Sequence, residues 1–185
     1  RALKFFSGKK DNANKKLVEQ IVLENYNRYY RMAYRYVHNE ADACDIVQNG
    51  ACMALKSSHT LKNPEYAGTW VYRIMINECF RFLKQPGHFS YEDMCEKNCL
   101  RTDGREDSYT DIDLRRAVDA LGDRDKAIII LRYFEDRKLE EIADILGESV
   151  NTVKSRLYRC MKKLRGTLSD GDGQSELNFS NGMGG

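Results

Sequence analysis

Apolar residues recur every three to four positions through most of the chain, which is the period of an amphipathic α-helix. The pattern predicts helices over about residues 15–37, 40–58, 66–84, 111–121, 124–135, 139–146 and 150–168. No alternating run rich in valine, isoleucine and threonine indicates a strand, and both prolines fall between predicted helices. The chain is therefore expected to be all-α, with Asn39 in "NEAD" capping the second helix.

The apolar side of each helix predicts which residues form the core. In helix 66–84 the expected buried residues are Val71, Tyr72, Met75, Ile76, Cys79, Phe82 and Leu83. In helices 111–121 and 124–135 they are Leu114, Ala117, Val118, Leu121, Ala127, Ile130, Leu131 and Phe134.

Residues 139–158 have the layout of a helix-turn-helix. The small side chain of Ala143 allows a close approach of two helices, Gly147 suits a left-handed helix end, and Ser149 can cap the next helix. On that last helix one side is apolar and is expected to be buried: Val153, Leu157, Cys160, Met161, Leu164 and Leu168.

The other side of the last helix is polar and basic. Residues 149–165 contain six basic side chains and no acidic one. The side chains expected to face outward are Asn151, Thr152, Ser155, Arg159 and Lys162, with Lys154, Arg156, Lys163 and Arg165 along the flanks. Such a face suits the major groove of DNA, where arginine can read guanine and the flanking cations meet phosphates. The alternative is a basic face that is merely solvated.

Helix 66–84 carries a second polar ridge, opposite its apolar side, formed by Trp70, Arg73, Asn77, Arg81 and Lys84. An aromatic ring beside cations suits single-stranded or distorted nucleic acid, because an unstacked base can lie on the ring while the backbone meets a cation. For Trp70, partial burial in the core is an equally open interpretation.

The charge is distributed unevenly, although the formal net charge is only +2. Residues 1–86 carry +6 and residues 114–168 carry +4, whereas residues 87–113 carry −5 and residues 169–185 carry −3. This predicts two small helical domains, 1–86 and 114–168, joined by an acidic flexible linker at 87–113 and continued by a disordered tail at 169–185. Two basic domains indicate a polyanionic partner.

Several functional classes find no support in the sequence. No apolar run approaches the roughly 20 residues that cross a bilayer, so we expect a cytoplasmic protein without membrane insertion. The six cysteines are scattered, form no CxxC pair and are expected to be reduced. With no phosphate loop and no metal-ligand spacing, we expect no enzyme, cofactor or metal; a redox or metal role for Cys95 and Cys99 in the linker remains open.

The segments "ACDIVQNGACMAL", "GTWVYRIMINECFRFLK" and "ALGDRDKAIIILRYFEDRKLEEIADILGESVNTVKSRLYRCMKKLR" together resemble an extracytoplasmic-function (ECF) sigma factor of bacterial RNA polymerase. The resemblance implies that the first domain, region two, binds the polymerase clamp and the promoter −10 element. It implies that the second domain, region four, binds the −35 element and the polymerase flap. The expected partners are core RNA polymerase, promoter DNA and an anti-sigma factor.

Individual roles are also implied by this resemblance. Asp45, Val47 and Gln48 match the clamp-binding helix, although Asn49 and Gly50 depart from the usual acidic residue after "DIVQ". Lys62 and Asn63 lie where the family captures a flipped −10 base, with Arg73 and Asn77 on the helix behind them. The −35 positions are matched by Lys154, Ser155, Arg156, Tyr158 and Arg159.

As a sigma factor, the chain would bind core polymerase, recognise the promoter and promote DNA melting. The alternative is a helix-turn-helix regulator that binds duplex DNA by itself and uses residues 1–86 for sensing or dimerisation.

Overall fold

The computed structural model describes the backbone of residues 2–85 and 109–172, and the side chains of residues 11–85 and 114–166. Every regular element in those ranges is a helix, as predicted. The chain divides into two compact units, one made of Arg1–His88 with Ile130–Val150 and the other of Phe89–Ile129 with Asn151–Gly185. Residues 130–150 thus group with the N-terminal part of the chain. None of the helices in the described ranges combines the length and apolarity needed to cross a membrane.

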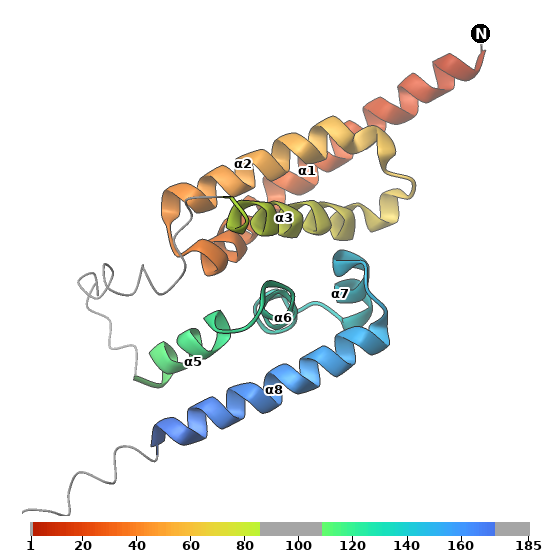
Figure 1. Ribbon diagram of the computed structural model, residues 1–185. Helices are drawn as coiled ribbons and strands as arrows, with labels where there is room; N and C mark the ends of the chain where they lie inside the picture. The colour runs from red at the N-terminus through yellow and green to blue at the C-terminus, as the bar shows by residue number, and fades with distance from the viewer. Residues whose placement is uncertain (1, 86–108, 173–185) are drawn as a thin grey trace, which may run out of the picture. The chain divides into compact units, whose positions relative to one another are not determined.

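The first unit is built on α1 (Ala2–Val37), α2 (Glu40–Ser57) and α3 (Ala67–Leu83), which lie side by side in Figure 1. Its core is made of large side chains that are almost completely buried, among them Tyr29, Met32, Ile46, Tyr72, Met75 and Ile76. The rings of Tyr29 and Tyr72 meet edge to face with centroids 4.9 Å apart, a favourable aromatic geometry. Burial, and after it the neighbouring Tyr72, raises the pKa of Tyr29.

Local caps hold the start of α2 and the connection from α2 to α3. Asn39 caps α2 by accepting a hydrogen bond from the backbone N–H of Asp42 at 3.0 Å, which confirms the prediction. After α2 the chain makes a short 3₁₀ turn, η1 (Ser58–Thr60), and then a second, η2 (Pro64–Tyr66). Asn63 caps η2 through a 3.1 Å bond from the N–H of Glu65 to its side-chain oxygen.

The predicted helix 124–135 is interrupted. It consists of α6 (Asp123–Ile129) and a π-helical turn, η3 (Ile130–Phe134), after which the N–H of Glu135 donates to the carbonyl of Ile130 at 3.1 Å. A π-turn holds more residues than an α-turn and shifts the register of the residues after it. As a result Phe134, predicted to be buried, is 48% exposed, and Glu135 is 4% exposed.

Helix α7 (Leu139–Leu146) comes next and ends as predicted. Gly147 has φ 67° and ψ 36°, the left-handed conformation, and the N–H of Glu148 donates to the carbonyl of Ala143 at 3.0 Å. A Cβ at Gly147 would also lie 3.1 Å from Nη2 of Arg73. Helix α8 (Val150–Asp172) begins directly after Ser149 and continues beyond residue 168, the predicted end.

The second unit contains α5 (Tyr109–Asp119), α6 and most of α8. Its core joins residues from all three helices: Ala117, Leu121, Ile129, Cys160 and Leu164, with Val118, Leu157 and Met161 packed against them. Leu114 is 37% exposed, so its predicted burial was wrong. Nζ of Lys126 pairs with Asp119 at 2.6 Å. Residues 86–108, most of the predicted linker, and residues 173–185 lie outside the described part of the chain.

Candidate nucleic-acid and polymerase interface

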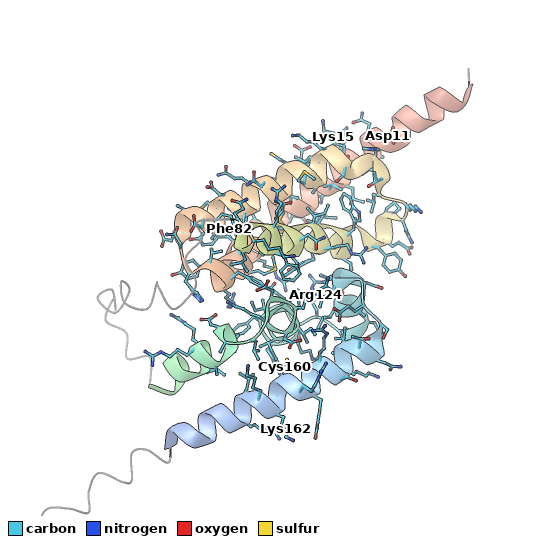
Figure 2. All side chains as sticks on the ribbon, in the orientation of Figure 1. Asp11, Lys15, Phe82, Arg124, Cys160 and Lys162 are labelled. Atoms are coloured by element: carbon cyan, nitrogen blue, oxygen red, sulfur yellow. The ribbon has the colours of Figure 1, made fainter. Side chains whose placement is uncertain are left out.

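Helix α8 separates a buried apolar stripe from an exposed polar face. Val153, Cys160 and Leu164 are at most 6% exposed. Figure 2 shows Cys160 and Lys162 on opposite sides of the helix. The predicted −35 residues are all exposed apart from the half-buried Arg156: Asn151, Thr152, Lys154, Ser155, Tyr158, Arg159 and Lys162. Helical periodicity therefore presents amides, hydroxyls and cations together on one surface.

Arg156 has an internal partner that the sequence did not reveal. Its Nη1 lies 2.7 Å from Oδ1 of Asp125 on α6, and the two side chains are 29% and 35% exposed. This ion pair ties α8 to α6 within the second unit. Lys163 makes a similar link, because its Nζ donates to the carbonyl of Ala120 at 3.2 Å. Neither contact can be predicted from spacing on one helix.

Cys160 is a packing residue at this site. Burial, together with the nearby carboxylate of Asp125, raises the pKa of its thiol. A thiol with a raised pKa stays neutral near pH 7 and is a poor nucleophile.

The predicted −10 face is formed by the segment between α2 and α3 and by the start of α3. Lys62 and Asn63 are exposed, and Asn63 already caps η2. Trp70 is half-buried, so it packs partly within the fold and remains partly accessible. It lines a pocket of about 440 Å³ together with Tyr66, Thr69, Arg73 and Asp144.

Arg73, Asn77 and Arg81 are exposed along one side of α3, as the helical period requires. Two of these residues make contacts within the first unit. Nε of Arg73 donates to the carbonyl of Ile145 at 3.3 Å, close to the left-handed end of α7. Arg81 pairs with Glu78, one turn earlier on the same helix, and keeps 56% of its side chain exposed.

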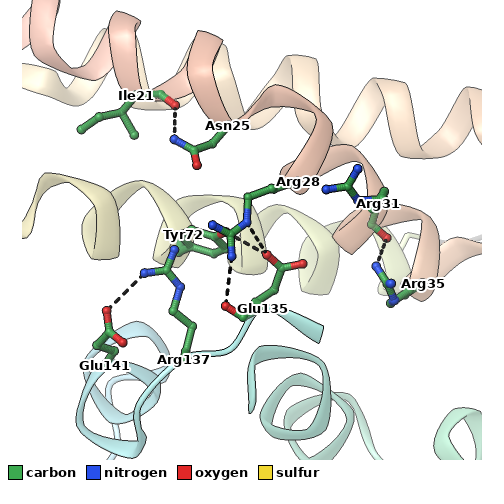
Figure 3. Close-up of polar contacts among 9 residues, drawn as sticks. All are labelled: Ile21, Asn25, Arg28, Arg31, Arg35, Tyr72, Glu135, Arg137 and Glu141. Carbon is green, nitrogen blue, oxygen red and sulfur yellow. Dashed lines mark hydrogen bonds and ion pairs between the residues drawn. The ribbon is translucent and has the colours of Figure 1, made fainter. Parts of the chain in front are cut away.

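A buried carboxylate, Glu135, holds polar contacts between α1, α3 and the segment after η3 (Figure 3). Glu135 accepts from Nε of Arg28 at 3.2 Å and from the hydroxyl of Tyr72 at 2.9 Å. Its backbone carbonyl accepts from Nη2 of Arg28 at 3.1 Å. The guanidinium of Arg137 lies over the Tyr72 ring, 4.2 Å from the centroid. Burial raises the pKa of Tyr72, so the hydroxyl remains a donor.

On α2, the predicted polymerase-binding residues differ in exposure. Asp45 and Gln48 are exposed, whereas Val47 is fully buried and contributes to the core of the first unit. Helix α2 runs unbroken through Gly50, which is buried against α3. A Cβ at Gly50 would collide with Sδ of Met75, so the close approach of the two helices accounts for this glycine.

Two polar residues at this site were missed by sequence reasoning. Glu135 becomes buried only because the π-turn changes the register, and no local signal announces that turn. Asn14 lies in the polar stretch "DNANKK" and looks like a surface residue, yet it is 3% exposed. A buried amide is recognisable only once its distant partners are known.

Within the described ranges, no group of three or more histidine, cysteine, aspartate or glutamate side chains is placed to hold a metal ion. Cys44, Cys52, Cys79 and Cys160 are not joined in disulfides. Cys95 and Cys99 lie outside the described residues.

Two family models match the chain at the positions of these faces. The model of Sigma-70 region 2 matches residues 21–88, and the model of Sigma-70, region 4 matches residues 111–164. The chain is 43% identical over 164 residues to the RNA polymerase sigma factor SigV of Bacillus subtilis strain 168, with 89% of this chain and 98% of that protein covered. The ECF RNA polymerase sigma factor SigW of the same strain is 27% identical, with 78% and 84% covered.

Solved structures share the fold. CnrH, in complex with the cytosolic domain of CnrY, superposes with a TM-score of 0.64 at 19% identity, covering 92% of this chain and 99% of that chain. The sigma factor RpoE of Bartonella quintana, in complex with the anti-sigma factor NepR, gives a TM-score of 0.62 at 20% identity, covering 82% and 96%. The matches to both sigma regions and to SigV leave no support for a stand-alone regulator. The chain belongs to the ECF sigma factors, non-enzymatic proteins that act with RNA polymerase to initiate transcription.

Proposed function

We propose that this sigma factor recognises the −35 element with the exposed face of α8. The observation that carries this proposal is the separation on α8 between a buried apolar stripe and a face on which Asn151, Ser155 and Arg159 are exposed. Arginine is suited to guanine, and amide and hydroxyl groups to other base edges or phosphates. Arg159 is the principal candidate for a base contact.

The −10 element is the proposed ligand of the segment after α2 and of the start of α3. Exposed Lys62 and Asn63 lie in that segment, and Trp70 and Arg73 line a pocket beside it. Asn77 and Arg81 continue the polar ridge along α3. An aromatic wall next to cations supports the capture of an unstacked base, with the strand's phosphates on the ridge.

The polymerase clamp is the proposed partner of α2. Asp45 and Gln48 offer a carboxylate and an amide on the exposed side of the helix, which suits a basic partner helix. Val47 supports this face from the core. Region four is proposed to contact the flap.

An anti-sigma factor is a further proposed partner, supported by the two fold relatives, whose solved structures contain CnrY and NepR. A factor that acts with RNA polymerase is proposed to work in the cytoplasm.

The decisive experiment is run-off transcription from pooled promoter fragments with purified bacterial core polymerase, with and without the full chain. The salt concentration is fixed, because phosphate contacts weaken steeply as salt rises. Discrete transcripts that require the chain are expected. Tight duplex binding without polymerase, and no transcripts, would contradict the proposal.

The clamp assignment is tested by replacing both Asp45 and Gln48 with alanine. This change is expected to weaken binding to core polymerase while the circular dichroism spectrum stays unchanged. Normal affinity for core polymerase would refute the clamp assignment.

A further inference from the structure

A buried amide on α1 holds the chain where it leaves α2. Asn14 is 3% exposed, and its Nδ2 donates to the carbonyl of Leu61 at 3.0 Å and to the carbonyl of Ser58 at 3.4 Å. These partners are 47 and 44 residues away along the sequence. Asn14 precedes the region 2 match, which begins at residue 21. A part of the chain outside both family models thus contacts the backbone that leads into the proposed −10 segment.

The carbonyl of Leu61 needs such a partner, whereas the carbonyl of Ser58 also accepts from the N–H of Leu61 at 3.1 Å. Helix ends leave backbone carbonyls without intrahelical donors, and an unpaired buried carbonyl is costly. The side chains of Ser58 and Thr60 donate to Leu55 and Ser57 at 2.9 and 2.7 Å. Those bonds satisfy earlier carbonyls of the turn. The carbonyl of Leu61 is bonded by Asn14 from another helix.

The carbonyl of Leu61 belongs to the same planar peptide unit as the N–H of Lys62. A hydrogen bond to that carbonyl therefore orients the first exposed residue of the segment. Residues 62–66 are exposed, whereas Leu61 and Ala67 on either side are 4% and 1% exposed. The exposed segment 62–66 therefore lies between two buried residues, Leu61 and Ala67, and Asn14 bonds directly to the carbonyl of Leu61.

We propose that Asn14 is a positioning residue for promoter melting: it fixes the peptide plane before Lys62 and so sets where Lys62 and Asn63 meet the −10 strand. This inference rests on the −10 role proposed above. Asn14 itself contacts no DNA and acts through the backbone of Leu61.

The test compares Asn14→Leu with Asn25→Leu in the full chain. Leucine has nearly the shape of asparagine but no N–H groups. Asn25 is a matched control on the same helix, because its Nδ2 donates to the carbonyl of Ile21 one turn earlier at 2.9 Å and does not hold the segment. Each holoenzyme is assayed for binding to single-stranded −10 oligonucleotides with the preferred and with altered bases. Core affinity, thermal midpoint and hydrogen exchange of residues 57–66 are measured in parallel.

Asn14→Leu is expected to reduce discrimination between the oligonucleotides by about tenfold, the loss that one well-placed hydrogen bond represents. Hydrogen exchange should accelerate at residues 57–66, while core affinity stays unchanged and Asn25→Leu behaves as wild type. Transcription from a template already unpaired at −10 should be less affected than transcription from duplex.

Unchanged discrimination between the oligonucleotides in Asn14→Leu would overturn the inference. A loss of discrimination that is accompanied by an equal loss of core affinity and a lower thermal midpoint would also overturn it, since that indicates general destabilisation. Failure of the underlying −10 function would look different. The −10 proposal is refuted if the wild-type holoenzyme does not discriminate between −10 oligonucleotides. It is also refuted if replacing Lys62 and Asn63 with alanine has no effect on that discrimination, whatever Asn14→Leu does.

Discussion

Nη1 of Arg156 lies 2.7 Å from Oδ1 of Asp125, so one of the cations predicted to bind the −35 element is paired within the second unit. The next arginine on α8, Arg159, is exposed. The two arginines are three residues apart and of the same chemical type, yet their expected roles differ. Arg156 links α8 to α6, and Arg159 faces the proposed DNA.

Alanine at each position should separate these roles. Arg159→Ala is expected to weaken −35 recognition by about 1–3 kcal/mol with little change in the free energy of unfolding, because it removes a base contact from an exposed side chain. Arg156→Ala is expected to lower the free energy of unfolding by no more than about 1 kcal/mol, since both partners are partly solvated. Holoenzyme binding to promoters with altered −35 sequences, together with urea unfolding, measures both effects. Unchanged promoter selectivity in Arg159→Ala would exclude it as a base reader.

The hydroxyl of Tyr72 is expected to stabilise the first unit through Glu135. Tyr72→Phe removes a 2.9 Å hydrogen bond to a buried carboxylate, a type of bond that contributes about 1.5–3 kcal/mol. The urea midpoint of the full chain should fall accordingly. Tyr34→Phe, at a tyrosine that is 37% exposed on α1, is the control and should leave the midpoint nearly unchanged. Equal midpoints for the two variants would mean that the Tyr72–Glu135 bond adds no stability.

Glu141 should make stability sensitive to acid. Burial acts to raise the pKa of this carboxyl, but hydrogen bonds from the N–H of Lys138 at 3.0 Å and from Nη1 of Arg137 at 3.2 Å lower it overall from its ordinary value of 4.5. A carboxyl with a lowered folded-state pKa stabilises the fold fully above the unfolded value, and this contribution is lost as the pH falls through the folded value. Urea unfolding between about pH 6 and pH 3 should therefore decline less steeply for Glu141→Gln than for wild type. Parallel pH profiles would contradict the assignment.

Gly147 is expected to resist substitution because of its backbone conformation. With φ at 67°, alanine should cost about 1–2 kcal/mol of stability, while asparagine, which tolerates the left-handed region, should cost less. Thermal unfolding of Gly147→Ala and Gly147→Asn measures the difference. If both variants lose the same amount, crowding against Arg73, 3.1 Å from the added Cβ, and not backbone strain explains the cost.

Local signals accounted for much of the molecule. The caps at Asn39 and Gly147 arise from side-chain and backbone chemistry that acts within a few residues. The burial of Val153, Cys160 and Leu164 reflects helical periodicity, and the same periodicity places Arg159 and Lys162 outside. Such features are predictable because one helix and its solvent decide them.

The remaining features depend on packing between helices that are far apart in sequence. Phe134, which was predicted to be buried, is exposed and its neighbour Glu135 is buried, because a π-turn changes the register. The bond from Asn14 to Leu61 spans 47 residues, and that from Arg28 to Glu135 spans 107.

The sequence by itself determined the all-helical class, the caps at Asn39 and Gly147, the main apolar faces and the resemblance to a sigma factor, since these depend on short-range order along the chain. Only the tertiary structure decided which polar groups are paired inside the protein. Arg156, Arg73 and Asn14 look alike as surface residues, but each has a partner that is distant in sequence. The reason is physical: a polar side chain is satisfied by whichever donor or acceptor the fold brings within about 3 Å, and sequence distance does not constrain that choice.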